Sequence, residues 1–283
     1  MVKKYQLKIL IGLFAITVVI WIFVFIENSP NRFLKVNFLD VGQGDAIFIE
    51  TLNKKQMLID GGPDLSILEK LGRIMPFYDR YIDVILLSHP EQDHLNGLIE
   101  VLKRYDVGII VMAGIVRDTE QYKEFAGLIK NKKIPTYIAY DGGIIDFDNN
   151  IDFNILYPLE DMSGKKLSDS NNYSVVGKLI YKNFSALFTG DIEKSVENKL
   201  IKSGVDLKAN IIKIAHHGSK TSSSENFLKA VNALMAIIEV GKDNSYGHPH
   251  QEVLDRLKNL LVLQTGISGN IQILTDGQKI ITK

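Results

Sequence analysis

The chain has 283 residues, of which 46% are hydrophobic and 23% charged, a globular composition that supplies a sizeable core. Lys plus Arg and Asp plus Glu each total 33, and the first 26 residues hold three Lys and no acid. The remainder therefore carries 33 − 30 = 3 excess negative charges, which argues against a broadly basic nucleic-acid-binding face. The lack of cysteine excludes disulfides and thiolate ligands, and leaves His, Asp and Glu as strong metal ligands.

An uncharged apolar stretch at residues 9–26 predicts a transmembrane anchor. Three lysines precede it and none closely follows, which predicts a cytoplasmic segment at residues 1–8 and a single-pass protein of the cell membrane with an extracellular domain. A cleaved signal peptide or a buried core helix are the alternatives, but no Ala-x-Ala-like cleavage site follows the stretch. Residues 27–32 are the expected linker, and residues 33–283 the expected catalytic domain.

Beyond the linker the hydrophobic pattern becomes β-like, with strands expected at 34–39, 45–50 and 56–60. The sequence DVGQGD joins the first two strands, and its glycines predict a tight turn with positive φ. We interpret Asp40, Asp45 and Asp60 as turn residues at one rim of the domain. Support of a nearby metal ligand is the alternative role for these carboxylates.

The apolar run at residues 84–87 predicts a buried strand, and the sequence SHPEQDH at 88–94 connects it to a helix-spaced segment. Open α/β sheets place their sites at this kind of strand-to-helix loop. Four potential metal ligands occur within six residues: His89, Glu91, Asp93 and His94. Imidazole and carboxylate at this density favour a divalent cation. The alternative is a polar turn with an Asp helix cap.

Further along, the pattern predicts alternating helices and strands. Helices are expected at 65–71, 119–130, 225–232 and 250–261. Strands are expected at 107–112, 135–140, 144–147, 151–157, 173–181, 185–189, 210–215 and 234–240, before short C-terminal strands. The interleaving by itself supports a mixed α/β domain.

Three later motifs also follow predicted strands. TGD ends with Asp191, AHHGS contains His216 and His217, and NSYGHPH contains Tyr246 and His248. All six histidines of the chain lie in these motifs or in the loop at 88–94, which chance surface histidines do not explain. The last one, His250, is as well placed to cap the next helix as to take part in chemistry.

A hydroxyl-rich segment, KTSSSE, follows the histidine pair. Ser222 and Glu225 fit a capping box, which is the default interpretation. Hydroxyls and free amides at a helix start also suit an anionic phosphate. On that alternative, Ser219, Thr221, Ser222 and Tyr246 are the candidate substrate-binding residues.

The loop at 88–94 resembles the His-x-His-x-Asp-His signature of the metallo-β-lactamase superfamily, with Glu91 where a second His usually stands. DVGQGD and HHGS resemble more narrowly the ComEC-type branch of competence proteins. The resemblance implies an αββα sandwich over residues 33–283, and an Asp191 that bridges two metals. It also implies that one of His216 and His217 joins Asp93 and His94, and that His248 lies in the site. The third histidine usual at the first metal is missing from the corresponding segment, residues 169–172.

Together these features predict a membrane-anchored metal-dependent hydrolase with two divalent ions, Zn²⁺ or Mn²⁺. The first ion is expected to bind weakly because oxygen ligands replace histidine there. A water of lowered pKa would attack a phosphodiester, in DNA or an envelope polymer. Asp93 and His248 are the predicted catalytic residues, and His248 would protonate the leaving oxygen. The full ligand prediction is His89, Glu91, Asp93, His94, Asp191 and His216 or His217.

Two other functions stay open from the sequence. One is a phosphoesterase that acts on cell-envelope polymers, such as phosphocholine esters of teichoic acid. The other is a catalytically degenerate module of a competence system that binds DNA or a protein partner, which the acidic Glu91 motivates. β-Lactam hydrolysis is disfavoured because those enzymes keep a fuller histidine set.

Overall fold

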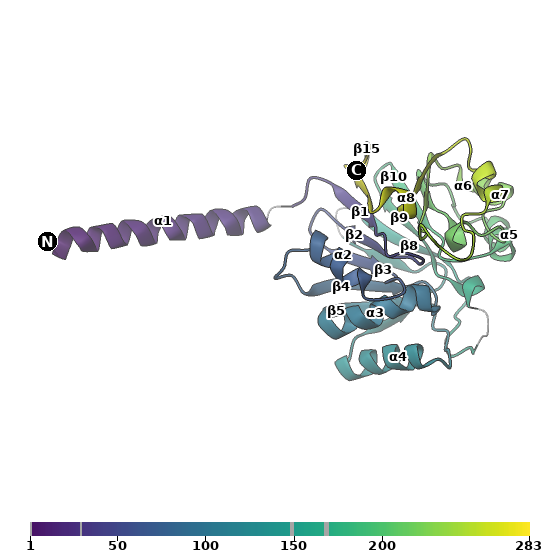
Figure 1. The fold of residues 1–283 in the computed structure, drawn as a ribbon, viewed down its shortest axis with the longest axis horizontal. Helices are drawn as coiled ribbons and strands as arrows, with labels where there is room; N and C mark the ends of the chain where they lie inside the picture. Colours follow the sequence, from purple (N-terminus) through teal and green to yellow (C-terminus); the bar gives the residue numbers. More distant parts are fainter. Residues whose placement is uncertain (1, 29, 148–149, 167–169) are drawn as a thin grey trace.

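The computed structural model describes residues 2–28, 30–147, 150–166 and 170–283. A single long helix, α1 (Val2–Asn28), projects away from the rest of the chain (Figure 1). Its segment Tyr5–Ile22 buries no residue against the domain, and by length and composition it can cross a membrane. The helix extends beyond both ends of the apolar stretch at residues 9–26.

The first sheet has eight strands in the order β15-β14-β1-β2-β3-β4-β5-β6. The strands from β3 to β6 run parallel, and the other pairs are antiparallel. The strand bounds are β1 (Leu34–Phe38), β2 (Ile47–Glu50), β3 (Gln56–Ile59), β4 (Tyr81–Leu87), β5 (Asp106–Met112), β6 (Thr136–Ile138), β14 (Ile271–Thr275) and β15 (Ile280–Thr282). Its outer face packs against α2 (Ser66–Ile74), α3 (Gln92–Arg104) and α4 (Glu120–Lys132).

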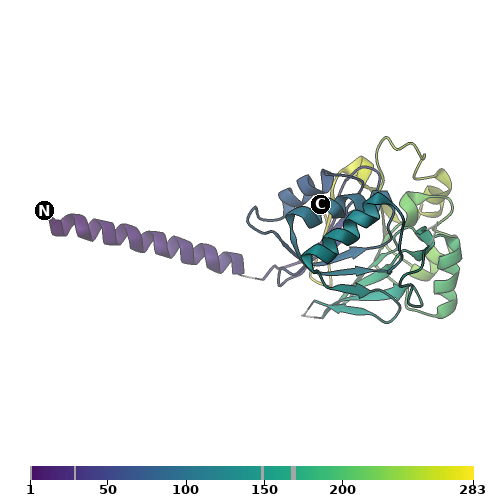
Figure 2. The same cartoon turned by 90° about the horizontal axis from the view of Figure 1, so that it is seen from below.

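The second sheet has seven strands in the order β13-β12-β11-β10-β9-β8-β7, of which β10 to β13 run parallel. The bounds are β7 (Ile144–Asp146), β8 (Ile151–Tyr157), β9 (Val176–Tyr181), β10 (Phe184–Phe188), β11 (Ile211–Lys213), β12 (Met235–Ile238) and β13 (Leu261–Gln264). Its outer apolar cluster includes residues of α5 (Lys194–Ser203), α6 (Glu225–Val231) and α7 (Gln251–Arg256). A short α8 (Thr265–Ser268) follows β13. Figures 1 and 2 show the helices outside the paired sheets, so the chain has the expected αββα sandwich.

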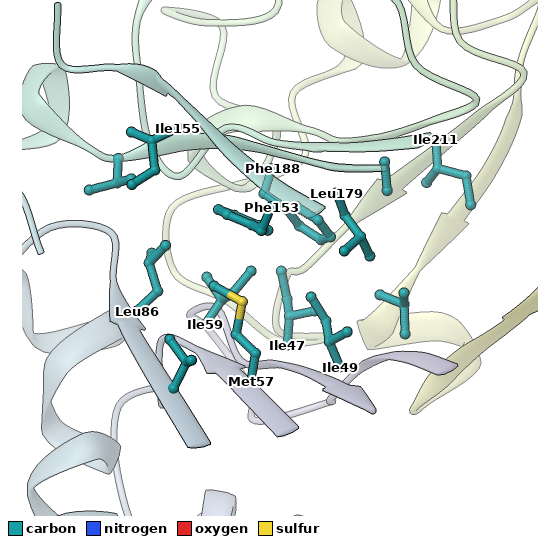
Figure 3. Packing of buried hydrophobic residues seen from close by; sticks show 14 of the residues in the cluster. Ile47, Ile49, Met57, Ile59, Leu86, Phe153, Ile155, Leu179, Phe188 and Ile211 are labelled. Carbon is teal, nitrogen blue, oxygen red and sulfur yellow. The ribbon is translucent and has the colours of Figure 1, made fainter. Parts of the chain in front are cut away.

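The main core lies between the two sheets (Figure 3). Alternate residues of β8 are buried, as a strand with one face on a core requires. Phe188 of the second sheet stacks on Phe153 with ring centroids 5.8 Å apart, and on Phe38 of the first sheet at 6.2 Å. The contact of Phe38 with Phe188 joins the two sheets at the ends of β1 and β10, next to the polar motifs.

The structure differs from the predicted elements at several places on the second sheet. The strand expected over 173–181 begins at Val176, after a 3-10 turn at Asn171–Tyr173, and the short α8 was not predicted. The helix expected over 250–261 ends at Arg256, because Leu261 to Gln264 pair with β12 as a parallel edge strand. Sheet pairing there overrides a helical pattern. The helix α5 was not predicted; it buries Val196 and Leu200 against the sheet.

Close backbone approach brings the DVGQGD turn against the start of α3. Gly44 has a φ of +137°, and a Cβ on it would lie 2.2 Å from the carbonyl oxygen of Asp93. The amide of Asp45 donates to that same carbonyl at 3.3 Å. Glycine is therefore required here, both for the backbone conformation and for the space.

Candidate metal centre

The polar motifs meet at one edge of the sandwich, where the parallel strands β4, β10 and β11 end. The loop after β4, the TGD turn after β10 and the 3-10 turn Ala215–Gly218 after β11 all border one pocket of about 340 Å³. Carboxyl ends of parallel strands are the usual position of such sites. The lining residues are Gln43, His89, Glu91, Asp93, Asn171, Asp191, His216, His217, Tyr246 and His248.

Histidine and aspartate atoms converge there closely enough to share a cation. Four overlapping groups of three residues have ligand atoms within 4.8 Å of one another. They are His89, His94 and Asp191; Asp93, His94 and His217; Asp45, Asp191 and His217; and Asp45, Asp60 and His94. Asp93, His94 and His217 form a three-residue set of the kind that leaves a fourth position open in catalytic zinc sites.

One buried carboxylate orients two of these histidines. Asp60 Oδ2 lies 2.9 Å from His94 Nδ1 and accepts the Ser88 hydroxyl at 2.6 Å. Since that hydroxyl donates its proton to Asp60, His89 Nδ1, 3.0 Å from Ser88 Oγ, must be the donor to Ser88. Nε2 of both rings is left buried without a hydrogen-bond partner. His89 lines the pocket, and His94 Nε2 lies 3.4 Å from Oδ2 of the pocket residue Asp191. Asp60 therefore has the contacts that the alternative role, support of a nearby metal ligand, requires, and its φ of +57° also suits a turn.

The two adjacent histidines have different surroundings. His217 is buried, its Nδ1 donates to the carbonyl of Glu239 at 2.9 Å, and its Nε2 lies 3.2 Å from Asp93 Oδ2 and 3.4 Å from Asp191 Oδ2. His216 is partly exposed, and its Nε2 lies 3.4 Å from the side-chain nitrogen of Asn171. Both residues have φ near +50°, so the backbone turns sharply and separates the two rings. Only His217 of the pair shares a ligand group with the aspartates.

A buried lysine neutralises part of the carboxylate charge. The ammonium of Lys213 contacts Asp45, lies 3.6 Å from Asp191 Oδ1 and donates to the carbonyl of Gly190 at 3.2 Å. Burial alone would lower the pKa of Lys213, but Asp45 and Asp191 raise it above its ordinary value. Asp45 is likewise buried and ion-paired, so this turn residue also has the contacts of the alternative, supporting role. Asp40, which accepts the amide of Gly42 at 3.4 Å, does act within the turn.

Protonation of the histidines compensates the remaining negative charge. Burial would lower the pKa of His217, but Asp191 and Asp45 raise it to about 10. Burial would also lower the pKa of His94, but the charges of Asp191 and Asp93 outweigh burial and raise this pKa well above its ordinary value. Burial and the neighbouring His94 hold the pKa of His89 at about 3. In the metal-free protein, the protons on His94 and His217 therefore supply the positive charge that a bound cation would otherwise supply.

Glu91 borders the pocket but lies outside all four ligand groups. Its Oε1 pairs with Arg117 at 3.0 Å and accepts the hydroxyl of Ser170. Its role as a ligand of the first metal stays a prediction. Asn171 brings its amide to the pocket from the segment where the family resemblance predicted a histidine that this chain lacks, while Asp169 falls outside the described residues.

The last motif forms the opposite wall. Asn244 Oδ1 accepts the amide of His248 at 3.0 Å, and its Nδ2 donates to the carbonyl of His248 at 2.6 Å. The Tyr246 ring stacks on His248 with centroids 5.8 Å apart. Burial and the nearby His217 lower the pKa of His248 to about 4, so its imidazole is neutral at pH 7.

The hydroxyl-rich segment lies beside this pocket rather than in its lining. Ser222 is buried and donates to the carbonyls of Ala215 and Ser219, while Ser224 caps α6. The expected capping box at Ser222 was therefore wrong. Ser219 and Thr221 share a hydroxyl contact at 3.1 Å, and substrate binding by these three residues stays a prediction. His250 precedes α7 without a side-chain cap, and its Nδ1 accepts the amide of Lys220 at 3.3 Å.

The donors present suit a divalent cation. His89 Nε2, His94 Nε2 and Asp191 Oδ1 are buried without hydrogen-bond partners, an arrangement that costs free energy unless something binds them. Sequence reasoning found most of the residues of the site, but it assigned no role to Lys213, Gln43 or Ser88. A single lysine inside the apolar strand β11 was a usable signal, because a lysine is rarely buried unless it is paired.

Residues 39–237 match the metallo-beta-lactamase superfamily, in the segment that carries the ligand loops and most of both sheets. The chain belongs to that superfamily. This metallo-beta-lactamase chain is 29% identical to ComE operon protein 3 of Bacillus subtilis over 84% of its length, and 30% identical to competence protein ComA of Neisseria gonorrhoeae over 87%. The matches span only 32% and 33% of those two proteins.

The solved structures agree on the architecture of this metallo-beta-lactamase domain. The metallo-beta-lactamase fold protein YhfI of Bacillus subtilis superposes with a TM-score of 0.55 at 10% identity, over 84% of this chain and 99% of that one. At this identity the likeness concerns the fold alone. The recognised superfamily and the converging His and Asp groups together support divalent metal binding and a metal-dependent hydrolase in general.

Proposed function

We propose that the protein is a membrane-anchored, metal-dependent phosphodiester hydrolase whose domain lies outside the cell. The observation that supports it most is the set of buried Nε2 atoms of His89 and His94, without hydrogen-bond partners, beside a solvent-open pocket that His89 and Asp191 line. A divalent cation bound there supplies a water of lowered pKa and neutralises charge on the electrophile. The proposed ions are two, Zn²⁺ or Mn²⁺, with the first bound more weakly.

The protein's own residues would divide the remaining tasks. His94, His217 and Asp93 would hold one ion, His89 and Glu91 would contribute to the other, and Asp191 would serve both. Asp60 keeps the imidazoles of His89 and His94 in the orientation that presents Nε2. Such preorganised ligands need little rearrangement when the substrate arrives.

The pocket wall suits an anionic ester with polar, uncharged contacts. The amides of Gln43 and Asn171 can hydrogen-bond a non-bridging phosphoryl oxygen, and Tyr246 offers a ring and a hydroxyl. His248 is neutral in the free protein, so it must first accept a proton before it protonates a leaving oxygen. An anionic phosphate beside the ring would raise the pKa of His248 and favour that step.

DNA is the first candidate polymer because the similar protein of Neisseria gonorrhoeae is named a competence protein. The chain spans about a third of that protein and of ComE operon protein 3, so their activities are not transferred with the similarity. A cell-envelope phosphoester is the second candidate, favoured by a pocket lining in which no Lys or Arg occurs among the described residues. A module that binds DNA or a protein partner without cleavage is the third.

The proposed topology rests on charge and length. Lys3, Lys4 and Lys8 precede the apolar segment of α1, and cytoplasmic flanks are rich in such residues. A reporter fused after Lys283 is therefore expected outside the cell, and protease is expected to remove the domain from intact protoplasts. Full protection of the domain would reverse the orientation.

Hydrolysis by the full-length protein in detergent tests the reaction. We expect cleavage of bis-p-nitrophenyl phosphate and of DNA with Mn²⁺ at least as fast as with Zn²⁺, and none after chelation. Cleavage of p-nitrophenyl phosphocholine alone would favour the envelope substrate. Asp191→Ala should lose both ions and Glu91→Ala only the weaker one. Stoichiometric metal without turnover on any phosphodiester would favour the binding module.

A further inference from the structure

A rigid aromatic tip lies between α2 and β4, next to the end of the linker. The amide of Asp79 donates to the carbonyl of Pro76 at 2.9 Å, which closes a turn with Phe77 and Tyr78 at its two central positions. Phe77 is 85% exposed and Tyr78 is 51% exposed. Their rings contact each other edge to face with centroids 5.3 Å apart.

Both ends of this loop are fixed to the domain. Met75 is buried, and its amide donates to the carbonyl of Leu71 at 2.8 Å. Asp79 accepts the side-chain amide of Gln56 at 2.6 Å and the backbone amide of Tyr81 at 3.1 Å. The exposed rings are thus held out on a supported turn, so burying them elsewhere would cost little conformational entropy.

The linker brings this tip close to α1. The amide of Asn31 donates to the carbonyl of Leu52 at 2.6 Å, and its side chain donates to Glu50 at 2.6 Å. The chain is therefore anchored to the domain from Asn31, only three residues after α1 ends at Asn28. Three residues span at most about 11 Å. Asn31 and Tyr78 line the same surface hollow. Figures 1 and 2 show that the segment between α2 and β4 lies at the edge of the domain that faces α1.

We propose that Phe77 and Tyr78 insert into the interface of the bilayer that α1 spans, and so dock the domain on the membrane. Aromatic side chains favour the membrane–water boundary. Lys54 in the hollow can place its charge among lipid headgroups while the rings enter. The short linker supports the bilayer as the occupant rather than a second copy or another protein.

Docking on this edge fixes where the pocket points. Strand β1 runs from the linker at Leu34 to the turn before Gln43, so the tip and the pocket lie at opposite ends of the first sheet. Five residues of strand alone separate them by roughly 16 Å. The pocket would then open away from the bilayer, toward soluble polymers rather than lipid phosphodiesters. The inference depends on the proposed anchoring by α1.

Fluorescence of the full-length protein in vesicles tests the docking. Trp21 is the sole tryptophan, so Trp21→Phe gives a silent background. Phe77→Trp reports on the tip and Tyr246→Trp, on a side chain 66% exposed at the pocket end, is the matched control. In phosphatidylcholine–phosphatidylglycerol vesicles, we expect a blue-shifted emission from Phe77→Trp and loss of most of its intensity when the acyl chains are brominated. Tyr246→Trp should show neither change.

An alkaline carbonate wash of the same vesicles separates the two claims. Protein that resists the wash while Phe77→Trp stays as exposed as Tyr246→Trp would overturn the docking and leave the anchor intact. Blue-shifted emission without quenching by brominated lipid would assign the tip to a protein partner instead. Protein released by the wash would overturn the anchoring and the docking together.

Discussion

His94 Nδ1 lies 2.9 Å from Asp60 Oδ2, and both residues are buried at the centre of the candidate metal site. The same oxygen accepts the Ser88 hydroxyl, to which His89 donates. Two separate candidate ligand rings are therefore oriented by one carboxylate that follows β3, the neighbour of the strand before the loop. Replacing Asp60 should therefore disturb the orientation of the two candidate ligand rings while leaving both histidines in place.

Asp60→Ala should weaken metal binding by roughly 10–100-fold, because the ligand rings lose their hydrogen-bonded orientation. Asp40→Ala is the matched control, since Asp40 accepts only within the DVGQGD turn. Calorimetric titration of the metal-free proteins measures both affinities. Equal affinities for Asp60→Ala and the unaltered protein would show that Asp60 does not orient the ligands.

His217→Ala should remove tightly bound metal, whereas His216→Ala should keep it. His217 faces Asp93 and Asp191, while His216 contacts Asn171 at the pocket edge. The two variants remove the same group from adjacent positions, so each controls for the other. Metal content after dialysis measures the outcome, and retention by His217→Ala with loss by His216→Ala would reverse the assignment.

The metal-free domain should lose stability as the pH rises. The folded pKa of His217 is about 10 against an ordinary 6.5, so its contribution is complete below pH 6.5 and disappears as the pH approaches 10. His94 acts in the same direction. Each such proton changes the free energy of unfolding by roughly 1.4 kcal/mol per pH unit within that window.

Urea unfolding with a chelator between pH 6.5 and 9 measures this decline. With saturating Mn²⁺ the decline should be much smaller, because the ion replaces the protons. The His217→Ala variant should show a reduced slope without metal. A free energy of unfolding that rises with pH in the chelated protein would contradict the protonation scheme.

Lys213→Met should destabilise the metal-free domain by roughly 3–5 kcal/mol, because it leaves Asp45 and Asp191 buried without their cation. Divalent metal should restore part of the loss. Lys178→Met is the control, since Lys178 is also buried but its partner Asp206 is 74% exposed. Because that partner is exposed to solvent, we expect Lys178→Met to lower the free energy of unfolding by about 1 kcal/mol or less. Equal losses in the two variants would mean that Lys213 acts only through packing.

The sequence pattern predicted a mixed α/β domain and the candidate ligand loops because both depend on local signals, whereas the αββα sandwich was implied by the family resemblance. Buried strands are short apolar runs, and loops rich in His and Asp stand out at their ends. The supporting roles of Asp45 and Asp60 depend on a turn and a strand end far apart in the chain, and nothing local marks them. The choice between His216 and His217 depends on two positive φ angles, which residue order does not specify. The pairing of Glu91 with Arg117 is a long-range contact of the same kind.

The central claim is tested most directly by the rate of bis-p-nitrophenyl phosphate hydrolysis by the full-length protein, measured without metal and across added Mn²⁺. We predict turnover that rises with Mn²⁺ to saturation, disappears on chelation, and is abolished by His94→Ala while circular dichroism shows the fold intact. Turnover that His94→Ala leaves unchanged, or none at all from protein with its metal bound, would contradict the account.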